Sequence, residues 1–109
     1  MEQIREALQR LVPGLADIFG PCLDRIILYG SVARGTQTEE SDVDVAVILH
    51  SYTQEMHDRM TDLAVDLELE YDLVLSILLI DLAEFQAWEE VLPFYQNVKK
   101  EGVVLWQAA

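Results

Sequence analysis

A short glycine-containing turn between two apolar runs most constrains how this chain can fold. The runs at residues 25–29 and 45–49 are rich in β-branched and aliphatic side chains, which is typical of buried strands. Between them lies the segment Gly30-Ser31-Val32-Ala33-Arg34-Gly35. Gly30 can adopt the positive φ of a sharp strand exit, and Ser31 is expected to cap a helical turn that ends at Gly35. Backbone N–H groups at the start of such a turn attract a phosphate.

Two aspartates, Asp42 and Asp44, open the second apolar run. Residues two apart on a strand face the same side, so these carboxylates are expected to converge beside the turn. Such a pair suits Mg²⁺, which is typically held by one or two carboxylates together with water and substrate phosphate oxygens. Two such ions can clamp the attacking and leaving oxygens of a displacement at phosphorus. The pattern therefore predicts a metal-dependent phosphate chemistry.

The arrangement Gly30-Ser31, ten residues, then Asp42-x-Asp44 resembles the signature of the polymerase β-type nucleotidyltransferases. The details Ala33-Arg34-Gly35 and Ser41-Asp42-Val43-Asp44 look most like the minimal nucleotidyltransferases, or MNT. The strong motif covers residues 30–44, and a looser similarity runs over 25–80. The resemblance implies a nucleotidyltransferase palm fold, ATP as substrate, two Mg²⁺ ions, and transfer of AMP to a hydroxyl group.

The resemblance also implies roles for single residues. Asp42 and Asp44 would bind the two Mg²⁺ ions, while Gly30 and Ser31 would hold the β- and γ-phosphates. A third carboxylate would come from the next strand, expected over residues 71–79, and would orient the attacking hydroxyl. The first candidate for this third carboxylate and metal ligand is Asp72, and the second is Glu70, which is expected on the same face of the strand. Alternatively, Asp72 has no role in the site and simply begins the strand at the surface.

Arg34 has two interpretations of equal weight. It could donate to a phosphate of the nucleotide, or it could pair locally with one of the acids that follow it, Glu39, Glu40 or Asp42. The histidines are expected to play no catalytic part, because His50 ends the second strand with no metal-ligand partner nearby.

The remaining patterns predict an α/β (α+β) fold with a small mixed sheet and helices packed on one face. A helix is expected over 3–11, stopped by Pro13-Gly14, and another runs to about residue 70. The nearly all-apolar run at 71–79 is expected to form a central strand. Asp81 heads a further helix, Pro93 begins another that Gly102 closes, and residues 103–106 form a last edge strand.

Length and charge limit what the chain can do. Its 109 residues are expected to form one nucleotidyltransferase domain over 1–109, and no apolar run approaches the ~20 residues that span a bilayer. Twenty acidic against seven basic residues give a net charge of −13, which argues against direct nucleic-acid binding. The charge favours a basic protein partner or metal ions that neutralise part of it, and an ordinary acidic surface explains it at least as well. The single cysteine, Cys22, fits a reducing cytoplasm.

A chain of this size has no room for a domain that grips the acceptor, so another polypeptide is expected to hold it. In the family that it resembles, the partner is a HEPN-type ribonuclease toxin, which the MNT protein modifies with AMP on a tyrosine and so neutralises as its antitoxin. Two alternatives stay open. The chain could be a catalytically vestigial module that neutralises its partner by docking, or a small-molecule nucleotidyltransferase, similar to the aminoglycoside enzymes, that acts as a homodimer.

Overall fold

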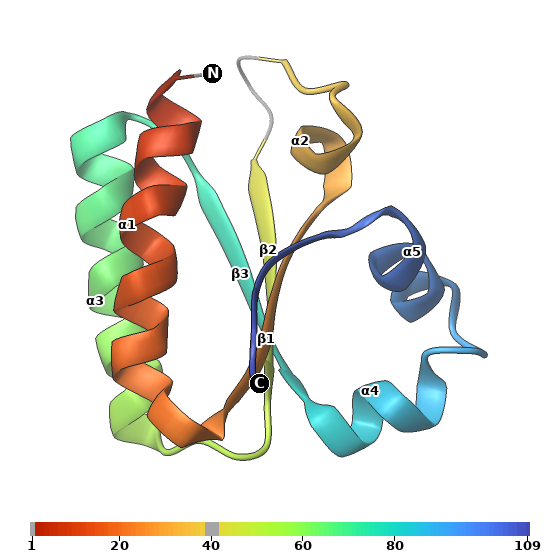
Figure 1. The fold of residues 1–109 in the computed structure, drawn as a ribbon. Helices are drawn as coiled ribbons and strands as arrows, with labels where there is room; N and C mark the ends of the chain where they lie inside the picture. Colours follow the sequence, from red (N-terminus) through yellow and green to blue (C-terminus); the bar gives the residue numbers. More distant parts are fainter. Residues whose placement is uncertain (1, 39–41) are drawn as a thin grey trace.

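The computed structural model describes residues 2–38 and 42–109, and its centre is a mixed four-stranded sheet with the order β3-β2-β1-β4 (Figure 1). Its strands are β1 (Leu23–Tyr29), β2 (Val43–Leu49), β3 (Leu75–Asp81) and β4 (Val103–Gln107). β1 is antiparallel to both β2 and β4, whereas β2 and β3 are parallel. The mixed sheet and the last edge strand were both predicted. The expectation that the third strand is central is wrong, because β1 and β2 occupy the centre and β3 lies at an edge.

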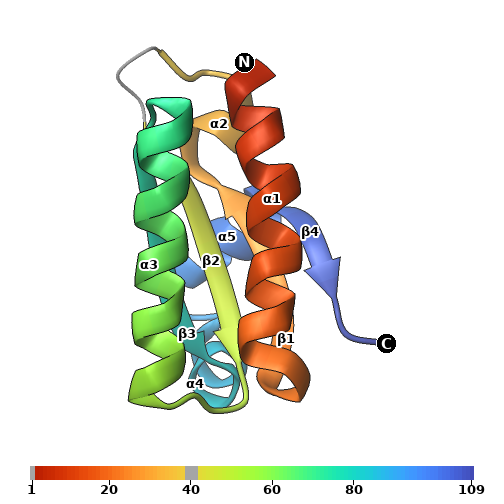
Figure 2. The ribbon, with the colours of Figure 1, turned by 90° about the vertical axis from the view of Figure 1, so that its left-hand side faces the viewer.

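Two long helices, α1 (Glu2–Phe19) and α3 (Gln54–Tyr71), lie side by side across one face of the sheet (Figures 1 and 2). Their apolar stripes meet the inward side chains of β1 and β2 in the larger of two buried clusters. Thr53 caps α3 by accepting from the Met56 N–H at 3.2 Å. Among the described residues, no polar or charged side chain is buried, so this core is entirely apolar.

The expected break of the first helix at Pro13-Gly14 is wrong, because α1 continues through both residues to Phe19. The apolar stripe explains the continuation: Leu11 before the proline and Leu15 after it are both fully buried. Burial of these side chains offsets the backbone hydrogen bond that a proline inside a helix removes. The presence of glycine at position 14 is explained by helix packing, since a Cβ there would lie 2.6 Å from a methyl carbon of Leu63 on α3.

Shorter helices lie against the opposite face, so the expectation of helices on one face only is wrong (Figure 1). α4 (Leu82–Trp88) and α5 (Pro93–Glu101) build a smaller buried cluster there with Ile27, Ala46 and Ile48 of the sheet. The structure confirms the helix starts at Asp81 and Pro93 and the closing Gly102. Between α1 and β1 lies a short 3-10 turn, η1 (Gly20–Cys22). No helix in the described ranges is both long and apolar enough to cross a membrane.

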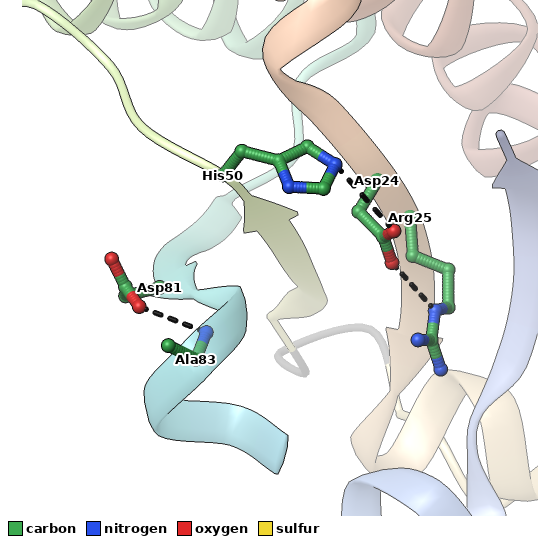
Figure 3. A network of polar contacts seen from close by, with 5 residues as sticks. All are labelled: Asp24, Arg25, His50, Asp81 and Ala83. Atoms are coloured by element: carbon green, nitrogen blue, oxygen red, sulfur yellow. Dashed lines mark hydrogen bonds and ion pairs between the residues drawn. The ribbon is translucent and has the colours of Figure 1, made fainter. Parts of the chain in front are cut away.

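Polar contacts at one end of the sheet are structural (Figure 3). His50 follows β2, and its Nε2 lies 3.9 Å from Asp24 Oδ1. The other carboxylate oxygen, Asp24 Oδ2, accepts from Arg25 Nε at 3.1 Å. Asp81 accepts from the Ala83 N–H at 2.9 Å and caps α4. These groups lie at the end of β2 opposite Asp44, so they take no part in the site described below.

Candidate active site

The turn after β1 forms helix α2 (Gly30–Arg34), which begins two residues before Val32, the start that the sequence predicts. Gly30 has a φ of +76° and Gly35 a φ of +75°, so both glycines use a backbone conformation that other residues rarely adopt. Gly35 ends the helix, and its N–H points to the carbonyl oxygens of Ser31 and Val32. The expected capping role of Ser31 is wrong, because Ser31 lies inside the helix rather than at its start.

Asp44 lies on β2 directly beside this turn. Its strand neighbours are Tyr29 on β1 and Ser76 on β3. A Cβ built on Gly30 would lie only 2.2 Å from Asp44 Oδ2, so the missing side chain of Gly30 is what lets the carboxylate rest against the turn. The structure therefore brings the glycine and the acid together, although Gly30 begins α2 and Asp44 lies on the following strand, β2.

Asp42 and Arg34 complete the electrostatic surroundings of Asp44. Burial raises the pKa of the Asp44 carboxyl above its ordinary value, the negative charge of Asp42 raises it further, and the positive charge of Arg34 opposes both. Asp42 is exposed and stands just before β2. Burial also raises the pKa of Tyr29, and the nearby Asp44 adds to that shift. Two like charges side by side are a site that a cation would stabilise.

Arg34 forms its ion pair with a residue that sequence reasoning missed. Its Nη1 donates to Glu101 Oε2 at 3.2 Å, and Glu101 is the last residue of α5. Of the expected local partners, Asp42 does not form this ion pair. The other two, Glu39 and Glu40, lie outside the described residues. No local pattern could indicate this contact, because 67 residues separate its partners.

The predicted third carboxylate does not stand on the third strand. Asp72 is the residue after α3, with a left-handed φ of 51°, and β3 begins only at Leu75. The helix reaches this far because Glu68 closes its end: its carbonyl accepts from the Asp72 N–H, and its carboxylate accepts from the Leu75 N–H at 2.9 Å. The β3 residue beside Asp44 is Ser76.

The fallback acid, Glu70, also stands elsewhere. It lies on α3 rather than on a strand, where its carboxylate accepts from the Arg10 guanidinium of α1. Within the described ranges, no group of three or more histidine, cysteine, aspartate and glutamate side chains is arranged to hold a metal ion. Asp42 and Asp44 supply two carboxylates, a number that would suit a Mg²⁺ ion whose remaining ligands come from water and phosphate.

A pocket of about 200 Å³ lies between α2 and α5, and two of its lining residues, Tyr29 and Gly30, are neighbours of Asp44. Gly30 and Arg34 border it on the α2 side, and the side chains of α5 border it on the other. Since typical small-molecule sites hold roughly 300–1,000 Å³, this space suits one part of a nucleotide rather than a whole one.

Comparison with known proteins identifies the family. A family model described as "Polymerase beta, Nucleotidyltransferase" matches residues 16–109. The chain belongs to this family. It is a nucleotidyltransferase, and Gly30, Asp42 and Asp44 all lie inside the matched range.

Individual relatives agree with this assignment. A Methanocaldococcus jannaschii protein named "Putative protein adenylyltransferase MJ0604" is 32% identical over 101 residues, which cover 93% of this chain and 96% of the relative. A crystal structure of a toxin–antitoxin with AMP-PNP superposes with a TM-score of 0.58 at 27% identity, covering 90% of this chain and 72% of the other. A solved structure described as "Structure of putative minimal nucleotidyltransferase" has the same fold, with a TM-score of 0.63, 24% identity and coverage of 94% of this chain and 92% of the other.

Proposed function

We propose that this nucleotidyltransferase transfers AMP from ATP to a tyrosine hydroxyl of a HEPN-type ribonuclease toxin and thereby acts as the antitoxin. The observation that carries the proposal is the contact of the Asp44 carboxylate with the Gly30 turn, which Asp42 and Arg34 flank. The relative named as a protein adenylyltransferase supports a protein acceptor. The similar toxin–antitoxin complex, which contains an ATP analogue, supports ATP and a toxin partner.

The proposed reaction is an in-line displacement at the α-phosphorus of ATP. The acceptor hydroxyl loses its proton to solvent, its oxygen forms the new bond to the α-phosphorus, and the bond to the β-phosphate bridging oxygen breaks, so pyrophosphate leaves. Mg²⁺, when bound, would neutralise the charge that develops on the phosphate oxygens. Catalysis of this kind depends mainly on positioning and electrostatic stabilisation.

Each residue of the site has a place in this proposal. Asp42 and Asp44 would hold the Mg²⁺ ions, and the backbone and hydroxyl at Gly30 and Ser31 would bind the β- and γ-phosphates. Arg34 would donate to a phosphate. Asp72, which stands outside β3, gains no support for the role of third carboxylate, so binding of a second ion would need a further oxygen ligand from the nucleotide or the partner.

Charge supports a basic protein as the partner. The chain carries a net charge of −13, and a nucleic-acid-binding toxin is expected to be basic around its active site. Opposite charges speed the encounter of two proteins and suppress wrong partners. A cytoplasmic location belongs to the same proposal, because it would keep the single Cys22 reduced and supply ATP.

The test is the intact mass of the partner after co-expression. The gene neighbouring the one for this chain, if it encodes a small helical protein, is expressed with the wild type and with an Asp42→Asn/Asp44→Asn variant, which keeps the shape of both side chains. We expect added AMP units with the wild type only, together with restored growth. A thermal melt of the variant confirms that its fold is intact.

The competing function, neutralisation by docking alone, is favoured by one observation: Ser76, not an acid, lies beside Asp44 on β3. In that case the co-expressed partner would stay unmodified in a tight complex, and the asparagine variant would protect as well as the wild type. Adenylylation of a small hydroxyl compound by the isolated chain as a homodimer would instead support the small-molecule enzyme. Either result would overturn the protein-modifying role.

A further inference from the structure

The pocket between α2 and α5 has walls of two chemical kinds. On one side, the Tyr29 and Phe94 rings meet edge to face, with centroids 5.6 Å apart and planes at 89°. Phe94 remains 42% exposed despite this contact and its second contact with Tyr95, so part of its ring is open to a ligand. Val98 of α5, which is almost completely buried, adds a further apolar surface.

Polar groups line the rest of the pocket. Asn97 is exposed on α5, and its amide offers both donors and an acceptor; Glu101, one turn further along the helix, adds a carboxylate acceptor. A flat heteroaromatic ring can stack on an aromatic side chain and bond to an amide, and sugar hydroxyls donate readily to a carboxylate. The combination fits a nucleoside better than it fits a phosphate, which the Glu101 charge would repel.

The pocket also has a direction. Arg34 connects Asp44 to α5, because it forms its ion pair with Glu101 and its positive charge also acts on the Asp44 carboxylate. A nucleotide whose phosphates lie beside Asp44 and Arg34 would therefore point its nucleoside along α5. The ion pair is about half-exposed at both side chains, so its net contribution to stability is small. Arg34 can exchange Glu101 for a phosphate at low cost.

We propose that this pocket binds the nucleoside of the donor nucleotide, with the base against Phe94 and with Asn97 and Glu101 bonding the base edge and the sugar hydroxyls. Binding then replaces the Arg34–Glu101 pair by contacts of both residues with the nucleotide. This inference rests on the proposed function, since it assigns the part of the substrate that the phosphate site does not hold. It makes α5 a determinant of affinity for nucleosides, not for phosphates.

The experiment compares two probes by calorimetric titration in the presence of Mg²⁺: ATP, and inorganic tripolyphosphate, which lacks the nucleoside. The wild type is expected to bind ATP at least tenfold more tightly. Asn97→Ala should weaken ATP binding by about 2- to 10-fold, the range for one hydrogen bond, and leave tripolyphosphate binding unchanged. Gln86→Ala on α4, which also removes an exposed amide from a helix, is the matched control and should change neither affinity.

Two further variants sharpen the result. Phe94→Leu should weaken ATP binding alone, because it keeps an apolar side chain but removes the stacking surface. Glu101→Gln frees Arg34, so tripolyphosphate should bind more tightly, by up to about fivefold for a surface pair of this kind. Equal binding of ATP and tripolyphosphate by the wild type, or unchanged ATP binding in both α5 variants Asn97→Ala and Phe94→Leu, would overturn the inference while the phosphate site stands. Failure of both probes to bind would contradict the proposed function itself.

Discussion

The two faces of the sheet differ in how completely helices cover them. α1 and α3 lie along one face (Figure 2). Each has 18 residues, and they enclose a core in which Leu15, Phe19 and Leu67 have no exposed surface. The helices on the other face, α4 and α5, have seven and nine residues, and next to them Asp44 stays partly exposed beside a pocket. The covered face therefore supplies stability, and the open face leaves room for a ligand.

Glycine serves the two faces in different ways. Gly14 lets α1 approach α3 closely, which improves packing on the covered face. Gly30 lets a carboxylate approach the backbone on the open face, which brings a charged group to a turn. The same residue type thus contributes apolar contact in one place and site geometry in the other, and mutations should separate the two contributions.

The largest effect on stability is expected from Leu67→Ala on the covered face. Leu67 is fully buried, and loss of such a side chain lowers the free energy of unfolding by about 2–5 kcal/mol. Leu69→Ala is the control on the same helix, because Leu69 is 79% exposed; its effect should stay within about 0.5 kcal/mol. Urea titration measures both. AMP transfer per folded molecule should be normal in each variant. Loss of AMP transfer in folded Leu67→Ala would contradict the conclusion that the covered face contributes to stability and not to activity.

An intermediate effect is expected from alanine at the two glycines that flank α2. Gly30→Ala and Gly35→Ala both force a residue with a Cβ into a left-handed conformation, at about 1–2 kcal/mol each. A Cβ at Gly35 meets nothing within 4 Å, whereas one at Gly30 would collide with Asp44 Oδ2. Melting curves should therefore shift for both, but nucleotide transfer should fall sharply only for Gly30→Ala. Equal activities of the two variants would show that the Gly30–Asp44 contact has no functional role.

The smallest effect is expected from Glu70→Gln on the covered face. The hydrogen bond from Arg10 lowers the pKa of Glu70 in the folded protein, so the ionised carboxylate stabilises the fold above the unfolded value of about 4.3. That stabilisation is lost as the pH falls through the lowered folded pKa. Wild type should thus melt slightly higher than Glu70→Gln at pH 7, and the difference should vanish in acid and shrink in high salt. AMP transfer should be unaffected by Glu70→Gln. Loss of AMP transfer would indicate that Glu70 is the third carboxylate of the site.

The sequence predicted the parts of this site that local patterns determine. The strand, the glycine turn and the acid pair are neighbours along the chain, and alternation along a strand placed Asp44 beside the turn. Helix caps such as Asp81 could be predicted for the same reason, because a capping side chain accepts from N–H groups only two or three residues further along the chain.

The parts that were missed depend on contacts between distant segments. Pro13 was expected to end a helix, but burial of Leu11 and Leu15 against the sheet keeps α1 continuous. Asp72 was expected on a strand, but the backbone N–H groups of Asp72 and Leu75 donate to Glu68 and close α3 there instead. The ion pair between Arg34 and Glu101 joins residues from different halves of the chain, and no spacing rule could have indicated it.

The most direct test of this account is a titration of the isotopically labelled chain with ATP and Mg²⁺, followed by backbone amide NMR. We expect shift changes confined to α2, the start of β2 around Asp44, and α5, with the outer residues of α1 and α3 unchanged. Asp42→Asn/Asp44→Asn should leave the unliganded spectrum unchanged away from the two substituted positions and lose the Mg²⁺-dependent part of these changes. Shifts centred on α1 and α3, or an undiminished response of the asparagine variant, would contradict the assignment of the nucleotide site to the open face.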